Sequence, residues 1–152
     1  MAMVYRIHLK IGAAFAKQVD RAALRAAARA ALAHQQAPAP GALTVMVADA
    51  ATLHRLNREF LAEDHPTDVL SFPAEDEGDP DTGEHYFGDI ALSWPTARAQ
   101  AKAAGHPVTA EMQLLVVHGV LHLMGHDHAG VRDKAKMWRA QADILESLRH
   151  PS

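Results

Sequence analysis

Residues 109–128 read TAEMQLLVVHGVLHLMGHDH. Two histidines, His118 and His122, stand four residues apart in an otherwise apolar run, and a third, His128, follows beyond Gly125. Apolar residues cover most of the helical circumference around the first two histidines, which predicts a buried central helix. Residues four apart lie on one helix face, with Cβ atoms about 6 Å apart. The first two imidazoles can therefore converge on one cation.

Gly125 accounts for the position of the third histidine. Glycine adopts the left-handed backbone conformation at little cost, so it can end the helix and turn the chain back toward the first two rings. Three neutral imidazoles on zinc leave a fourth position open, which is the arrangement of catalytic rather than structural zinc sites. Imidazoles are also costly to bury in an apolar helix without partners. We therefore predict one zinc ion bound by His118, His122 and His128.

The same spacing occurs in the metzincin protease pattern His-Glu-x-x-His-x-x-Gly-x-x-His. In this chain Gly119 stands where that pattern has its general-base glutamate. Glycine cannot accept a proton, so that protease mechanism is excluded while the metal geometry is retained. Asp127 has two interpretations: it orients a ligand histidine through the second ring nitrogen, or it caps the helix that follows. His126 fits the ligand spacing less well than His128.

Composition restricts the class of protein. The chain has 152 residues, 49% of them hydrophobic, with no cysteine and a formal net charge of -3. The lack of cysteine excludes disulfides, thiolate zinc sites and a thiol nucleophile. No apolar run reaches the roughly 20 residues of a membrane span, and the N-terminus lacks a signal-peptide core. We expect a soluble, cytoplasmic protein with no membrane contact. The negative charge argues against a broad basic surface for nucleic acid.

Local patterns predict an α+β fold for residues 1–152 as one domain, with a small mixed sheet flanked by helices. Alternation and short β-branched runs predict about four strands, at 4–9, 43–47, 69–72 and 87–93. Apolar spacing, caps and breakers predict about five helices, at 15–34, 50–61, 95–104, 109–123 and 131–148. Asp49 and Thr109 are the expected N-caps of two of these helices. The acidic segment 75–84 contains glycine and proline, which predicts an exposed loop.

A row of basic residues marks the first predicted helix. Lys17, Arg21, Arg25 and Arg29 recur every four residues and would line one helix face. A solvated charged face is the ordinary explanation. The alternative is a contact surface for nucleic acid.

With these motifs in view, the chain resembles the YbeY family of rRNA maturation factors, which are metal-dependent endoribonucleases. The histidine segment from His118 to His128 looks like that family's signature. The segment PTDVLSFP, from Pro66 to Pro73, resembles its central motif, and Gly88-Asp89-Ile90 resembles the strand that follows. Leu56-Asn57 also fits. The resemblance thus spans about Leu56 to His128 in order.

The resemblance implies an α+β fold, zinc on the three histidines and endonucleolytic processing of rRNA, notably at the 3′ end of small-subunit rRNA. It also implies a role in ribosome quality control. The expected partner is rRNA or the small ribosomal subunit, with a ribosomal protein or an assembly GTPase as further candidates. If the 66–73 segment lines a cleft, the hydroxyls of Thr67 and Ser71 are the candidates for substrate contacts. The alternative is that they bond to backbone while their apolar neighbours join the core.

One departure concerns the family segment Leu-Asn-x-x-Tyr-Arg. Here the aromatic residue is Phe60, and Leu61 replaces the arginine that the family links to activity. Arg58 lies three positions earlier, and a shift of three keeps roughly the same helix face, so Arg58 is a candidate substitute. Arg58 and Asp127 are the candidate catalytic residues, and the sequence identifies no general base.

Two alternative functions stay open. One keeps the metal and changes the substrate, giving a metallohydrolase of another class such as an amidase; the absent glutamate counts against it. The other is a non-enzymatic ribosome assembly factor in which a structural zinc holds the 118–128 turn. The net charge also leads to the hypothesis that a ribosomal protein or assembly factor delivers the protein to rRNA, with Arg21, Arg25 and Arg29 as a secondary contact.

Overall fold

A computed structural model of the protein describes residues 4–61, 67–75, 78–126 and 130–149. Along the chain its elements are β1 (Tyr5–Ile11), the 3-10 helix η1 (Ala13–Phe15), α1 (Arg21–His34), β2 (Gly41–Ala48), α2 (Ala50–Leu61), β3 (Val69–Pro73), β4 (His85–Ser93), α3 (Trp94–Ala104), α4 (Val108–Leu123) and α5 (Val131–Arg149).

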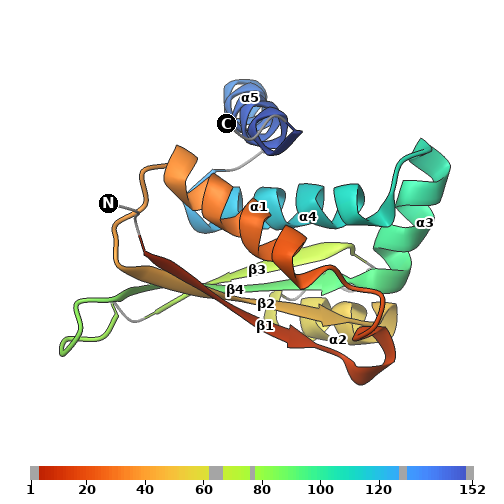
Figure 1. Ribbon diagram of the computed structural model, residues 1–152, viewed down its shortest axis with the longest axis horizontal. Helices are drawn as coiled ribbons and strands as arrows, with labels where there is room; N and C mark the ends of the chain where they lie inside the picture. Colours follow the sequence, from red (N-terminus) through yellow and green to blue (C-terminus); the bar gives the residue numbers. More distant parts are fainter. Residues whose placement is uncertain (1–3, 62–66, 76–77, 127–129, 150–152) are drawn as a thin grey trace.

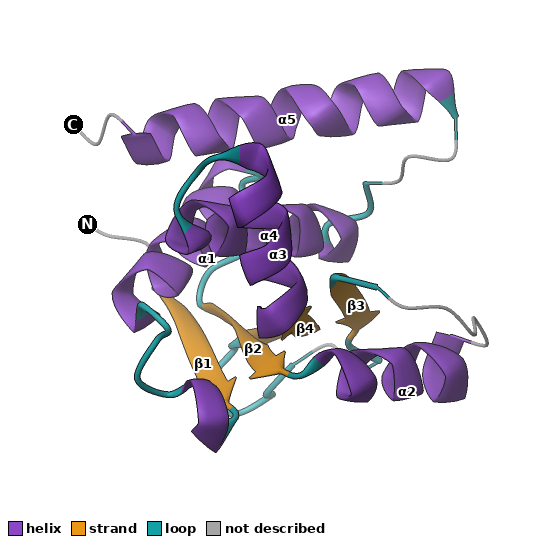
Figure 2. Ribbon diagram, turned by 90° about the vertical axis from the view of Figure 1, so that its right-hand side faces the viewer, coloured by secondary structure: helices purple, strands orange, loops and turns teal. Residues whose placement is uncertain are grey.

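The four strands form one mixed sheet in the order β1-β2-β4-β3. β1 pairs with β2 and β2 with β4 in parallel, whereas β3 pairs with β4 antiparallel. Helices α1 and α4 cover one face of the sheet and α2 lies on the other (Figure 1). α5 packs on α1 and α4 as a further layer, which Figure 2 shows from the side. The predicted α+β fold with a small mixed sheet and five helices is confirmed.

The main core lies between the sheet and the helices on its α1 and α4 side. Alternate residues of β2 point into it because side chains alternate across a strand, and Leu43, Val45 and Val47 are fully buried there. α4 is buried around most of its circumference, as its near-uniform apolar sequence predicts. The buried central helix predicted from the sequence is therefore confirmed.

Two helix starts differ from the prediction. The helix expected from residue 15 begins at Arg21, because the Asp20 carboxylate accepts a hydrogen bond from the backbone N–H of Ala23 (3.1 Å) and caps it. Lys17 therefore lies before the helix and does not extend its row of arginines. α4 begins at Val108 after Pro107, so Thr109 lies inside the helix and is not its N-cap.

The other expected boundaries agree more closely. α2 has the predicted limits, and the Asp49 carboxylate accepts a hydrogen bond from the Thr52 N–H (2.8 Å) as its cap. Gly105 and Gly125 both follow helices with positive φ, 73° and 94°. Their left-handed conformation ends α3 and α4 as expected. From Asp79 to Gly83 the acidic loop is exposed.

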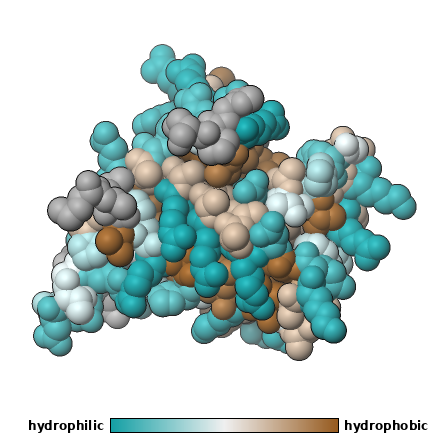
Figure 3. Space-filling model, in the orientation of Figure 1, coloured by the Kyte–Doolittle hydropathy of each residue, from teal (hydrophilic) through white to brown (hydrophobic). Residues whose placement is uncertain are grey.

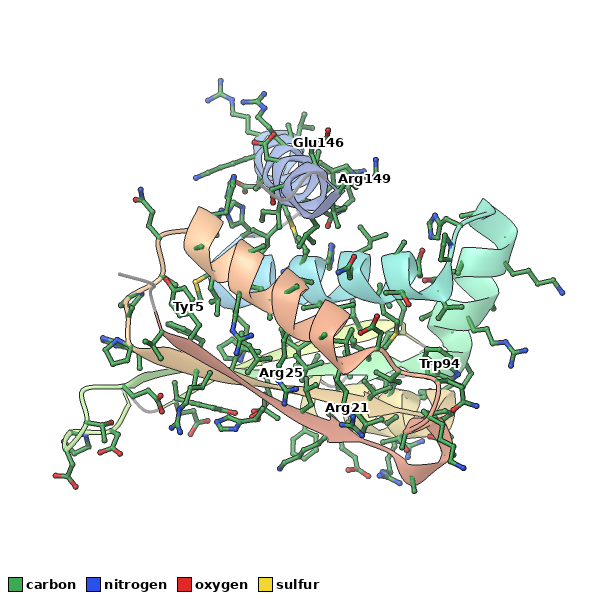
Figure 4. The ribbon with its side chains drawn as sticks, viewed as in Figure 1. Tyr5, Arg21, Arg25, Trp94, Glu146 and Arg149 are labelled. Carbon is green, nitrogen blue, oxygen red and sulfur yellow. The ribbon has the colours of Figure 1, made fainter. Side chains whose placement is uncertain are left out.

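The row of arginines on α1 covers an edge of the sheet. β1 is an edge strand, and its outward carbonyls at Ile7 and Tyr5 accept hydrogen bonds from the guanidinium Nε–H groups of Arg25 (3.2 Å) and Arg29 (3.1 Å). Figure 4 shows Arg25 between α1 and this strand. Charged groups that block an edge discourage pairing with other chains. These contacts favour a structural role for the two arginines.

The outer surface is mixed in character. On the face seen in Figure 3, hydrophilic areas alternate with small apolar ones. Within the described ranges, no helix is both long and apolar enough to cross a membrane.

Candidate metal centre

Two of the three predicted ligands converge on the cleft side of α4. The Nε2 atoms of His118 and His122 lie 3.1 Å apart. Two imidazoles bound tetrahedrally to one zinc at 2.0–2.1 Å would have their nitrogens about 3.3 Å apart. The observed spacing is close to that value, so the pair fits a zinc ion. His128, the predicted third ligand, and Asp127 lie outside the described residues, and the residues that are described contain no group of three potential ligands.

A glutamine of α5 fixes the protonation of the first ligand. His118 Nδ1 lies 3.0 Å from the Gln141 Oε1 atom. An amide oxygen only accepts, so Nδ1 carries the proton and the Nε2 lone pair faces His122. This is the tautomer that a metal requires, and a hydrogen bond to the second ring nitrogen is the usual support of a metal-bound histidine. The Trp138 ring packs edge-on against His118, with centroids 5.8 Å apart.

Gln141 and Trp138 were not predicted from the sequence. Both come from α5, whose rotation about its own axis is set by the buried side chains of Met137, Ala140 and Ile144. The amphipathic pattern of α5 identifies its buried face. It does not identify which polar residues beside that face meet α4.

A cleft of about 640 Å³ opens beside the two histidines, between α2 and α4 along the edge strand β3. The described residues that line it are Asn57, Leu61, Thr67, Asp68, Val69, Leu70, Ser71, Pro73, His118 and His122. The segment that resembles the central family motif therefore lies next to the histidine segment, although some 45 residues separate them in the chain.

The two predicted substrate contacts, Thr67 and Ser71, both line this cleft, and both also bond to backbone. The Ser71 hydroxyl donates to the Gly119 carbonyl (3.0 Å) and the Thr67 hydroxyl donates to the Val69 carbonyl (3.2 Å). Ser71 therefore ties the edge strand to the helix that carries the histidines. With their protons engaged in this way, both hydroxyl oxygens can still accept hydrogen bonds from a ligand.

Asp68 connects the cleft to α3. Its carboxylate accepts a hydrogen bond from the Gln100 side-chain amide (3.2 Å), and its carbonyl accepts one from the Ser93 N–H (3.0 Å). Asp68 is the one carboxylate residue among the described residues that line the cleft. Its hydrogen bond to Gln100 orients it toward α3.

Gly119 is explained by packing between α4 and β4. A Cβ atom at this position would lie 2.8 Å from Ile90 Cγ2 and 3.2 Å from two other carbons of the same side chain. Real Cβ atoms are essentially never found so close to another carbon. Any larger residue at position 119, including the glutamate of the metzincin pattern, would require the Ile90 side chain to shift.

The end of α2 presents Leu61, not Arg58, to the cleft. Asn57 and Leu61 are four residues apart, about 40° around the helix, and both line the cleft. Arg58 is rotated about 60° from Leu61, is exposed, and is not among the described lining residues. No lysine or arginine belongs to the described lining.

The His126 side chain is bonded to the residue that follows α1, and it is not among the described lining residues of the cleft. Its Nε2–H donates to the Gln35 side-chain oxygen (2.8 Å). Burial lowers the pKa of His126, and the nearby charges of Lys136 and His34 lower it further. This hydrogen bond ties the turn after α4 to the residue that follows α1.

Comparison with known proteins identifies the family to which the chain is similar. The family model described as Endoribonuclease YbeY matches residues 9–149. The Endoribonuclease YbeY of Roseiflexus sp. (strain RS-1) is 37% identical over 147 residues, covering 93% of this chain and 92% of that one. The protein of the same name from Chloroflexus aurantiacus (strain ATCC 29366 / DSM 635 / J-10-fl) is 38% identical over 156 residues, covering 98% and 99%.

A solved structure has the same fold. The solution structure of TM1509 from Thermotoga maritima matches with a TM-score of 0.60 and 23% sequence identity, covering 94% of this chain and 87% of that one. At this identity the likeness concerns the fold alone. The match of the family model to most of the chain, together with the two relatives, shows that this chain belongs to the YbeY endoribonuclease family.

Proposed function

We propose that this protein is a zinc-dependent endoribonuclease that processes rRNA in the cytoplasm, at the 3′ end of small-subunit rRNA, and contributes to ribosome quality control. The observation that carries the zinc site is the convergence of the His118 and His122 Nε2 atoms, 3.1 Å apart, beside a cleft. Membership of an endoribonuclease family supports RNA as the substrate.

In this proposal His118, His122 and His128 hold one zinc ion, and residues 1–152 act as a single metal-dependent hydrolase domain. When bound, zinc supplies Lewis-acid activation of water and of the phosphoryl group. Gln141 keeps the proton of His118 on Nδ1, so that Nε2 carries the lone pair with which a metal would be bound. Asp127 is a candidate to orient another of the ligand rings.

The cleft residues offer contacts that favour RNA over DNA. The 2′-hydroxyl, which only RNA carries, can donate a hydrogen bond. The oxygens of Thr67 and Ser71 are placed to accept such bonds at the wall of the cleft, because their own protons are engaged with backbone carbonyls. We propose these two hydroxyls as ribose contacts rather than phosphate contacts.

The described cleft residues provide little positive charge to balance the phosphates of an RNA substrate. Leu61 takes the place where the family has an arginine, and no lysine or arginine is among the described lining residues. We propose that the metal provides most of this compensation, and that a ribosomal protein or assembly GTPase brings the protein to its substrate. Arg58 stays a candidate only if its side chain moves toward the cleft.

Cleavage of a small-subunit rRNA precursor by the purified, zinc-loaded protein tests this proposal. We expect His118→Ala and His122→Ala to abolish cleavage, and His85→Ala to retain it, because His85 is exposed and lies outside the described cleft lining. The proposal is wrong if the fully loaded protein cleaves no precursor under conditions in which the Chloroflexus aurantiacus relative does.

The described lining of the cleft contains no lysine or arginine, which favours a second candidate, a non-enzymatic assembly factor with a structural zinc. The two candidates differ in what His118→Ala changes. A structural metal predicts a large loss of thermal stability and no cleavage by the wild type. A catalytic metal predicts lost cleavage with a modest change in unfolding temperature. The amidase alternative is disfavoured, since position 119 is a glycine and supplies no general base.

A further inference from the structure

A second pocket lies away from the histidine cleft, where η1 meets α3. Its volume is about 510 Å³, and its walls include Phe15, Gln18, Trp94, Arg98 and Lys102. η1 follows β1 and α3 follows β4, so the pocket lies near the carboxyl ends of these two parallel strands. Ligands of open α/β sheets bind in crevices at this end of the strands. We call it the η1–α3 pocket.

The η1–α3 pocket is positively charged in a chain whose net charge is negative. Its described lining contains Arg98 and Lys102 and no carboxylate. Three other pockets in the described part of the chain each include at least one aspartate, and a fourth has no lysine or arginine. This pocket is therefore the better match for an anionic ligand.

Arg98 and Lys102 are not engaged by the fold itself. They are four residues apart on α3, so they share one face and repel each other. Both are exposed, and neither forms an ion pair with another described residue. Arg25 and Arg29 differ in this respect, because their guanidinium groups are bonded to β1. An anion between Arg98 and Lys102 would offset their repulsion.

An aromatic pair forms another wall. The rings of Phe15 and Trp94 are tilted by 38° with centroids 6.4 Å apart, and both side chains are half-buried. Figure 4 shows Trp94 at the end of the molecule where α3 begins. Both rings also pack against the core, so part of their surface faces the pocket. Aromatic surface next to cations is the composition with which proteins bind single-stranded nucleic acid, through base stacking and phosphate contacts.

We propose that the η1–α3 pocket binds a single-stranded part of the RNA substrate outside the scissile position, with a base against Trp94 and phosphates on Arg98 and Lys102. The inference rests on the proposed function, because it names a further contact for that substrate. The exposed Lys17, next to Gln18 in the chain, extends the positive charge beside the pocket.

The charge contribution is tested by binding of a fluorescein-labelled oligoribonucleotide of about 12 nucleotides, measured by fluorescence anisotropy at several salt concentrations. Arg98→Ala/Lys102→Ala is compared with Lys136→Ala/Arg139→Ala. Each double variant removes two exposed cations from one helix, but the control pair lines a pocket that also holds Asp133 and Asp143. The net charge of the two variants is equal, so only the position of the lost charges differs.

Loss of two phosphate contacts lowers the slope of log affinity against log salt by about 1.4 for single-stranded RNA. We expect this change for Arg98→Ala/Lys102→Ala, with weaker binding, and little change for the control. Equal slopes in the two variants, or a wild-type slope in the first, would overturn the inference.

Stacking is tested through intrinsic fluorescence. The chain has two tryptophans, so Trp138→Phe leaves Trp94 as the sole indole. We expect the RNA to quench its emission, and Arg98→Ala/Lys102→Ala to shift the quenching to higher RNA concentration. No quenching at saturating RNA would contradict stacking on Trp94. Equal quenching by a polyglutamate peptide of similar length would show that the pocket takes acidic chains in general and would overturn the assignment to RNA.

The outcomes separate this inference from the proposed function. If the wild type cleaves the precursor while the Arg98→Ala/Lys102→Ala variant binds RNA normally, the inference fails and the function stands. If RNA binds through this pocket but the zinc-loaded wild type cleaves no precursor, the inference is supported and the function fails.

Discussion

Replacement of Gly119 by alanine tests how closely α4 packs on the sheet. The new Cβ would lie 2.8 Å from Ile90 Cγ2, roughly 1 Å inside the usual contact distance between carbons. Alanine favours a helix interior over glycine by about 1 kcal/mol. Overpacking of a core costs about 1–3 kcal/mol, so we expect a net loss of roughly 0–2 kcal/mol in the free energy of unfolding.

A double-mutant cycle with Ile90→Ala isolates the clash from the helix propensity. Ile90→Ala removes the carbons that the new Cβ would meet, so Gly119→Ala should be less costly, or stabilising, in that background. The expected coupling is about 0.5–3 kcal/mol. Ala142→Gly, at an exposed position of α5, serves as the control for propensity and should cost about 1 kcal/mol.

Urea unfolding followed by circular dichroism measures all four proteins of the cycle and the control. Additive effects of Gly119→Ala and Ile90→Ala, with no coupling, would refute the packing explanation of Gly119.

Three further perturbations test individual contacts of the histidine segment and its neighbours. Gln141→Leu removes the acceptor of the His118 Nδ1–H and should lower zinc affinity about 10–100-fold in competition with a chelating dye, whereas Gln141→Glu should retain it; equal affinities would contradict the role of the glutamine. Ser71→Ala leaves the Gly119 carbonyl without its hydroxyl donor and should cost about 0.5–1.5 kcal/mol in urea unfolding, and no loss would mean that this bond contributes nothing. Burial lowers the pKa of His126 from 6.5, so the folded state binds fewer protons there than the unfolded state. The resulting stability is present above about pH 6.5 and declines as the pH falls below it. His126→Gln should make stability less dependent on pH between about 7 and 5.5, and an unchanged pH profile would contradict this.

Local signals predicted most of the elements, and the errors have local causes. α2 was predicted with its observed limits because Asp49 is a strong cap and a helical pattern follows directly. The start of α1 was missed because the alanine-rich pattern extends backward past Asp20, whose carboxylate ends it. The α4 start was missed because Pro107 takes the cap position without any side-chain hydrogen bond.

In the candidate site too, contacts within one helix could be predicted from the sequence, whereas contacts between elements could not. Spacing along one helix predicted that His118 and His122 converge, because four residues on a helix fix their separation. The contacts of Gln141 and Ser71 could not be predicted, since they depend on how α5 and β3 lie against α4. The packing of Ile90 on Gly119 likewise joins elements that are distant in sequence. Only the assembled fold determines such contacts.

X-ray absorption spectroscopy of the purified protein, combined with metal analysis, tests the central claim most directly. The proposal predicts one zinc ion per chain with three imidazole nitrogens at about 2.0–2.1 Å and a light-atom ligand in the fourth position. His122→Ala should lose that ion, and His85→Ala should keep it. Zinc that remains at full occupancy in His122→Ala, or that has fewer than three imidazole ligands in the wild type, would contradict the assignment of His118, His122 and His128.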